Sequence, residues 1–173
     1  RAAAPARRTA QQPKPLSDPL LKAGARQNAI FNSVNFSSIA TDAEGVIQIF
    51  NVGAQRMLGH APGGVIDRLT PADISDPQEL VERAASLSSE FGADISPGFE
   101  ALVYKALRGI EDIYELTYIR ADETRFPALV SVTALRGGDD EVIGFLLIGT
   151  VNTARRKADA ARTLLDQRLR DQQ

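Results

Sequence analysis

The fold is decided by residues 110–152, which read IEDIYELTYIRADETRFPALVSVTALRGGDDEVIGFLLIGTVN. Three β-rich runs stand in this stretch, at 110–120, 125–136 and 142–152. They are separated by Ala121-Asp122-Glu123-Thr124 and by Gly137-Gly138-Asp139-Asp140, which are short enough for antiparallel hairpins. The stretch therefore predicts three consecutive strands of one antiparallel sheet.

Two further strands are predicted upstream. They are β-like runs at 37–41 and 46–50, with a turn between them. Helical patterns fill the region before residue 110: one from Asn51 as N-cap to Gly59 as C-cap, one opened by Asp76-Pro77 with Leu80, Val81, Ala84 and Leu87 at helical spacing, and one from Phe99 to Gly109. The order of elements predicts an α+β fold, with a five-stranded antiparallel sheet and helices on one face.

The ends of the chain predict flanking segments. Residues 1–16 are polar and contain three prolines, which indicates a disordered linker. Residues 17–34 suit an N-terminal flanking helix, residues 35–152 form the domain, and residues 153–173 lack Gly and Pro and predict a C-terminal helix. Because the chain does not begin with Met, we expect it to be a piece of a longer protein.

Composition excludes several classes of function. The 173 residues include no cysteine, which excludes disulfides, thiolate nucleophiles and Cys-ligated metals. The net charge of −2 gives no general attraction for nucleic acid, and the basic residues near both ends are interpreted as solvated flanks. The longest apolar run, Phe145-Leu146-Leu147-Ile148, is far shorter than the ~20 residues of a membrane span. We therefore expect a cytoplasmic domain without nucleic-acid or membrane contact.

Four stretches carry a resemblance to a known family. They are IATDAEGVI at 39–47, FNVGAQRMLG at 50–59, YIRADETRFP at 118–127 and GFLLIGTVNTARR at 144–156. In this order the chain resembles the PAS family over about residues 30–157. The resemblance implies a PAS sheet and a sensory role, typically in bacterial histidine kinases of two-component systems or in cyclic-dinucleotide signalling proteins, and no catalysis by this domain itself.

Two positions depart from the PAS pattern. Glu123 stands in the hairpin where the family favours Gly, and Val151 stands where the exit motif usually has Asp. Since valine accepts no hydrogen bond, we expect a junction between the last strand and the exit helix that is either differently coupled or loosened. The resemblance implies a signal relay through Val151, Asn152, Thr153 and Arg155, with Val151 as its weak point.

The resemblance also implies a candidate pocket between sheet and helices. The amides that typically hold a flavin ring in light-sensing relatives fall at Tyr118, Ala128 and Gly149, and none of these is an amide. By the period of two along strands, Val130, Val132 and Leu147 point the same way. The candidate pocket of Tyr118, Ala128, Val130, Leu147 and Gly149 either holds a small ligand or is closed by larger neighbours.

Cofactors and catalysis find little support in the sequence. His60 is the only histidine, and the helix at 99–107, where haem-binding relatives usually place their ligand, has none. We expect no cofactor and no metal. The acidic groups at 111–112 and 139–141 are interpreted as solvated rather than as acid–base pairs. Two alternatives stay open: a flavin- or haem-dependent sensor of light, redox state or gas, and a small cone-fold enzyme with a buried carboxylate.

The C-terminal helix has the spacing of a short coiled-coil seam. Ala154, Ala158, Ala161 and Leu165 step by four, three and four residues, and Arg168 then ends the pattern. We expect a homodimer through the flanking helices, with a parallel helix pair that leads into a covalently linked output domain, in first place a histidine kinase.

Overall fold

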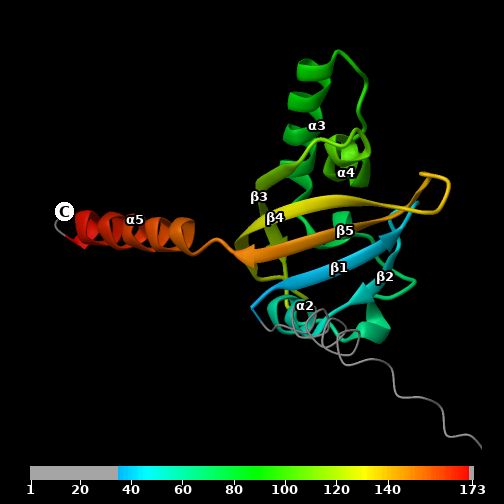
Figure 1. Ribbon diagram of the computed structural model, residues 1–173. Helices are drawn as coiled ribbons and strands as arrows, with labels where there is room; N and C mark the ends of the chain where they lie inside the picture. The colour runs from blue at the N-terminus through cyan, green and yellow to red at the C-terminus, as the bar shows by residue number, and fades with distance from the viewer. Residues whose placement is uncertain (1–34, 172–173) are drawn as a thin grey trace, which may run out of the picture. The chain divides into compact units, whose positions relative to one another are not determined.

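The computed structural model describes residues 35–171. The linker expected at 1–16 and the flanking helix expected at 17–34 lie outside this range. The elements, in chain order (Figure 1), are β1 Ser37–Asp42, β2 Ile47–Phe50, α2 Val52–Leu58, the 3₁₀ turns η1 Pro62–Gly64 and η2 Pro71–Ile74, α3 Pro77–Phe91, α4 Phe99–Leu107, β3 Asp112–Ile119, β4 Arg125–Arg136, β5 Val142–Val151 and α5 Thr153–Asp171.

The strands form one sheet in the order β2-β1-β5-β4-β3, with antiparallel pairing throughout. The predicted five-stranded antiparallel α+β fold is confirmed. The first strand lies beside the last one, because the helices between β2 and β3 take the chain across one face before the three final strands return (Figure 1). Strand β5, which leads into α5, is therefore central in the sheet.

Local capping explains where the helices begin and end. Asn51 Oδ1 accepts hydrogen bonds from Ala54 N at 2.8 Å and from Ser38 N at 2.9 Å, so one side chain caps α2 and fixes it to β1. Gly59 ends α2 in the left-handed conformation, with φ 70°. Asp76 caps α3 through the backbone N–H groups of Gln78 and Glu79. These predicted boundaries are confirmed.

Two predictions made from the sequence pattern are wrong. Val81 was expected on the apolar side of its helix but is 46% exposed, since the buried stripe of α3 consists of Leu80, Ala84 and Leu87. The strand expected from Ile110 begins at Asp112, and Ile110 is exposed. The stripe of α3 that faces the protein is narrow, so Val81, one residue after Leu80, lies outside it, and the local pattern overestimates the buried face.

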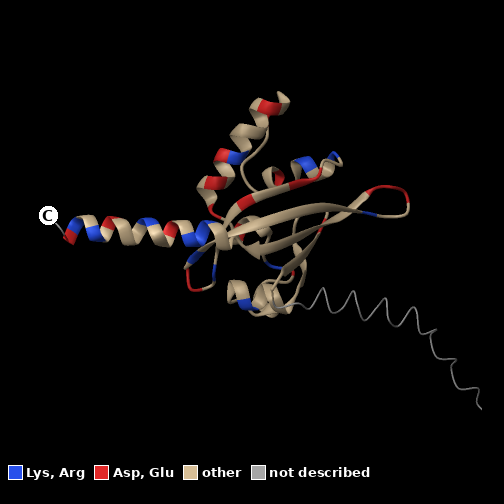
Figure 2. Cartoon of the chain, turned by 60° about the vertical axis from the view of Figure 1, so that its left-hand side comes forward, with Lys and Arg blue, Asp and Glu red and all other residues tan. Residues whose placement is uncertain are grey.

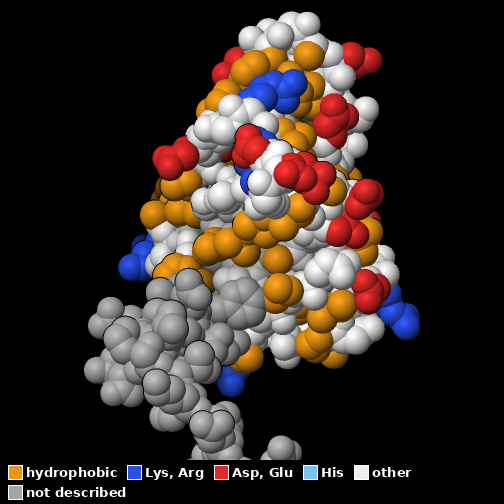
Figure 3. Space-filling view, turned by 45° about the vertical axis from the view of Figure 1, so that its right-hand side comes forward, with side chains coloured by type: hydrophobic (Ala, Val, Ile, Leu, Met, Phe, Trp, Pro, Cys, Tyr) orange, Lys and Arg blue, Asp and Glu red, His pale blue; other side chains and the backbone are white. Residues whose placement is uncertain are grey.

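The core lies between the sheet and the helices. Alternate residues of the strands enter it with side chains from α2, α3 and α4, and the largest fully buried ones include Tyr118, Phe145, Ile39 and Leu147. On the other face of the sheet some apolar side chains are exposed: Ile113 is 72% exposed, and Leu129 is exposed as well. Figure 3 shows hydrophobic side chains gathered on the surface with acidic groups beside them.

The β3–β4 hairpin accommodates the unusual Glu123. This residue has φ 68°, the left-handed conformation that glycine adopts without strain. The turn still closes, because Glu123 N donates to Arg120 O at 2.9 Å and Arg120 N donates to Thr124 O at 2.7 Å.

Within residues 35–171, no helix combines the length and the apolar character that crossing a bilayer requires.

Candidate functional site

The junction between β5 and α5 is organised by Asn152, which is 5% exposed. Its backbone N–H donates to Pro127 O at 2.8 Å, and this bond fixes the residue to β4. Its side-chain oxygen accepts from Arg155 N at 3.2 Å, and its carbonyl accepts from Arg156 N at 3.0 Å. Asn152 therefore acts as the N-cap of α5 while it belongs to the sheet.

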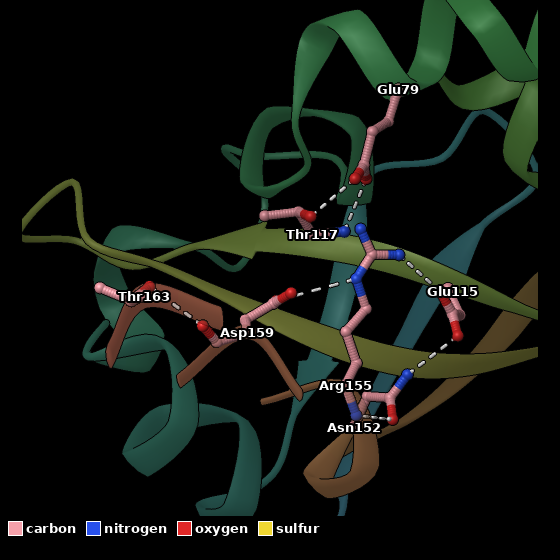
Figure 4. A network of polar contacts seen from close by, with 7 residues as sticks. All are labelled: Glu79, Glu115, Thr117, Asn152, Arg155, Asp159 and Thr163. Carbon is pink, nitrogen blue, oxygen red and sulfur yellow. Dashed lines mark hydrogen bonds and ion pairs between the residues drawn. The ribbon is translucent and has the colours of Figure 1, made fainter. Parts of the chain in front are cut away.

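Glu115 of β3 completes the junction (Figure 4). Asn152 Nδ2 donates to Glu115 Oε1 at 3.2 Å, and Arg155 Nη1 donates to Glu115 Oε2 at 2.6 Å. The hydrogen bond to Glu115 is the main reason that the pKa of Arg155 is raised. One carboxylate thus binds both the capping residue and the first turn of the exit helix.

The four expected relay residues have different surroundings. Asn152 and Arg155 belong to the network, and the exposed Thr153 hydroxyl donates to Val151 O at 3.4 Å. Val151 packs against the apolar core. Val151 offers no acceptor where the family usually has Asp, and the side-chain oxygen of Asn152 supplies one a residue later, so the junction is coupled differently.

Charge is distributed unevenly between the domain and its exit helix. Residues 35–152 contain 18 acidic and 8 basic side chains, whereas residues 153–171 contain 6 basic and 3 acidic ones. Figure 2 marks acidic residues on α3 and at the β4–β5 hairpin, and mostly basic residues with a few acidic ones along α5. The negative charge of the domain therefore attracts the positively charged α5 over a long range. The short-range ion pair with Glu115 fixes the position of Arg155.

The residues of the candidate pocket lie together in the core, as the sequence predicted. Tyr118, Ala128, Val130 and Leu147 are at most 1% exposed, and Gly149 is buried. The space beside Gly149 is filled, however, because a Cβ atom there would lie 2.7 Å from Ser37 Oγ and 3.2 Å from Tyr118 Cε2. Of the two alternatives, a core closed by larger neighbours is the one found next to this glycine.

The Tyr118 hydroxyl is the unusual polar group in this core. It makes no hydrogen bond to any residue in the part of the chain that the structure describes. Burial raises the pKa of Tyr118 well above its usual range. Beside Gly149 there is no room for a flavin ring, since Ser37 and Tyr118 occupy that space, and the three aligned positions offer no amide.

The enzyme alternative requires a buried carboxylate. Among residues 35–171, the buried polar side chains are those of Ser37, Ser38, Thr41, Asn51, Ser75 and Asn152, none of which is acidic. His60 follows the C-cap of α2 and is half-buried. No cluster of three metal-ligating side chains occurs in the described range.

A sheet in the order β2-β1-β5-β4-β3, with helices on one face and an exit helix after its last strand, defines a class of small α+β domains. Within that class, the model of the family described as PAS fold matches residues 25–151. The chain belongs to the PAS family, and the resemblance in its sequence is confirmed.

Solved structures agree with this assignment. The PAS domain of a protein from Colwellia psychrerythraea matches with a TM-score of 0.55 and 16% identity, over 77% of this chain and 98% of that one. The PAS domain of an HTR-like protein from Haloarcula marismortui matches with a TM-score of 0.51 and 19% identity, over 77% and 94%. At these identities the likeness shows the fold.

A longer neighbour is an RNA-binding light-oxygen-voltage receptor, with a TM-score of 0.59 and 15% identity. The match covers 94% of this chain and 42% of the receptor chain, so the chain corresponds to less than half of that protein. The comparison with curated protein sequences finds no match.

Proposed function

We propose that this PAS domain is a sensory and dimerisation module that passes a change through the β5–α5 junction to an output domain after α5. The observation that carries the proposal is the binding of Asn152 and Arg155 by Glu115, a residue of another strand. Helix α5 itself has no buried residue, so these contacts determine how it leaves the sheet. A small ligand or a protein partner that shifts β3 changes the hold on α5 by a population shift.

The partner proposed for α5 is a second copy of this chain. Leu164, Leu165 and Leu169 are each more than half exposed on a helix of 19 residues. A helix of this length is only marginally stable alone, and its apolar side chains gain ~1.5–3 kcal/mol each on full burial. Two copies paired along the seam that includes Leu165 would give the output domain a dimeric connection, as a histidine kinase uses.

Sedimentation of the intact chain tests the dimer. We expect association at micromolar concentration, and we expect Leu165→Asp to weaken it at least tenfold because the charge would enter the paired surface. Leu129→Asp on the sheet is the matched control and should leave association unchanged. Equal association of both variants would reject α5 as the contact.

Amide hydrogen exchange tests the relay. Glu115→Gln removes the charge that binds Arg155, and we expect exchange at Arg155 and Arg156 to become about two- to fivefold faster. Glu44→Gln, in the distant β1–β2 turn, is the control. If Glu115→Gln leaves α5 unchanged, the proposed transmission through this junction is wrong. The coding sequence after residue 173 tests the output domain, which we expect to be a histidine kinase or a cyclic-dinucleotide enzyme.

A further inference from the structure

A second carboxylate, Glu79 of α3, binds the same strand two residues from Glu115 (Figure 4). Thr117 N donates to Glu79 Oε2 at 2.7 Å, and Thr117 Oγ1 donates to Glu79 Oε1 at 2.6 Å. Thr117 O in turn accepts from Asp76 N at 3.0 Å. The backbone N–H, the carbonyl and the hydroxyl of Thr117 are therefore all bound by the start of α3.

This use of Glu79 differs from the usual role of a glutamate at its position. Glu79 is the third residue of α3, where a glutamate commonly reaches back to the backbone N–H of the N-cap residue. Here the N–H of the N-cap, Asp76, donates to β3 instead, and the Glu79 carboxylate binds β3 as well. The first turn of α3 is thus built to hold the strand rather than to close its own end.

The strand brings this contact close to the exit helix. Glu115 and Thr117 project from the same face of β3, because side chains two residues apart lie on one side of a strand. Arg155 is bound to Glu115 and half-exposed, and its pKa is raised first by that hydrogen bond and further by the charges of Asp159 and Glu79. The positive charge of Arg155 therefore interacts with two carboxylates, that of Glu79 on α3 and that of Glu115 on β3.

We propose that Glu79 is a positioning residue of the relay, which couples α3 to α5 through Thr117, Glu115 and Arg155. While Thr117 holds Glu79, the guanidinium of Arg155 is bound by Glu115 at 2.6 Å and lies 3.9 Å from Asp159 of its own helix. A shift of α3 that frees Glu79 adds a second carboxylate that competes for Arg155, and the start of α5 loosens from Asn152. This inference rests on the proposed function and names where its input enters.

Helix α3 packs in two places, because Leu80 near its start belongs to the main core. Its second half and α4 share an apolar cluster that is separate from the main core and consists of Ala84, Leu87, Ile95, Ala101 and Tyr104. A ligand or partner that displaces this helix pair would move the start of α3 and, through Leu80, Leu102 and Val103, would also act on the packing of the main core. The input side of the domain is then α3, and the output side is α5.

The test is exchange at the Arg155 and Arg156 amides of the intact chain, measured by NMR relative to the amides of β4. Thr117→Val removes the hydroxyl that donates to Glu79 and leaves the negative charge of Glu79 in place. Because the freed carboxylate then competes for Arg155, we expect about three- to tenfold faster exchange in the first turn of α5. Adding Glu79→Gln removes the competing charge, and the double variant should return to within twofold of the parent. Thr133→Val, an exposed change on the same sheet face, is the control and should have no effect.

The outcomes separate this inference from the proposed function. If Glu115→Gln loosens α5 while Thr117→Val does not, transmission through the junction stands and the role of Glu79 is wrong. If Thr117→Val loosens α5 and Glu79→Gln fails to reverse the effect, Thr117 acts only by packing, and the inference is overturned. If neither Glu115→Gln nor Thr117→Val changes exchange in α5, both proposals fall together.

Discussion

Replacing Tyr118 by phenylalanine tests the interpretation of the core. The Tyr118 hydroxyl is buried without a hydrogen-bond partner among the described residues, and such a group costs roughly 1–3 kcal/mol of stability. Phenylalanine keeps the ring and its edge-to-face contact with Phe126, whose centroid lies 5.9 Å away. After a loss of some dispersion contacts, we expect Tyr118→Phe to raise the free energy of unfolding by about 1 kcal/mol.

Tyr114 on the same strand provides the matched control. Its hydroxyl donates to Leu102 O at 3.1 Å, so Tyr114→Phe should lower the free energy of unfolding by about 1 kcal/mol. Urea denaturation followed by circular dichroism measures both changes as shifts of the midpoint at constant slope. If Tyr118→Phe destabilises the protein as much as Tyr114→Phe, the Tyr118 hydroxyl has a partner in solution, and the closed core beside Gly149 is the wrong description.

Four other outcomes are expected. Glu123→Gly should stabilise the chain by about 0.5–1 kcal/mol in thermal unfolding, since φ 68° strains a glutamate; a lower melting temperature would contradict this. Val151→Asp should destabilise sheet and helix together by about 1–3 kcal/mol in hydrogen exchange, because Val151 packs against the core; a gain of protection confined to α5 would contradict it. Above pH ~10 the urea midpoint should fall, because burial raises the folded-state pKa of Tyr114 and Tyr118 and the unfolded chain loses these protons first; a constant midpoint up to pH ~11 would refute that. The purified protein should be colourless, and a flavin or haem band in its absorption spectrum would show a cofactor.

The parts of the fold with local signals could be predicted from the sequence. Asn51 and Gly59 bound α2 as expected, because a cap depends on residues within one turn of the chain. The inward positions of Tyr118, Val130 and Leu147 follow from the period of two along a strand. These signals depend on neighbours in sequence, and the sequence contains them in full.

The polar contacts of the junction could not be predicted in the same way. Glu115 binds Asn152 and Arg155 only because β3, β4 and β5 align in one register, with Leu116 opposite Ala128 and Ala128 opposite Val151. Glu79 reaches Thr117 only because α3 begins beside that strand. Neither alignment can be recognised from residues that are neighbours in the sequence, because both join segments that are far apart along the chain. The shift of the acceptor from position 151 to Asn152 was likewise hidden, because a family motif shows the usual position and not its substitute.

The most direct test of the account is hydrogen exchange at the Arg155 and Arg156 amides in Asn152→Ala. This change removes both the N-cap of α5 and its bond to Glu115, and a lost cap is worth about 0.5–2 kcal/mol. We predict roughly three- to thirtyfold faster exchange at these two amides, with β3 and β4 amides within a factor of two of the parent. Thr153→Ala should change little, because the Thr153 hydroxyl is exposed and its hydrogen bond to Val151 O is long, at 3.4 Å. Unchanged exchange in α5, or an equal loss of protection across the sheet and the helix, would contradict the claim that Asn152 couples the sheet to its exit helix.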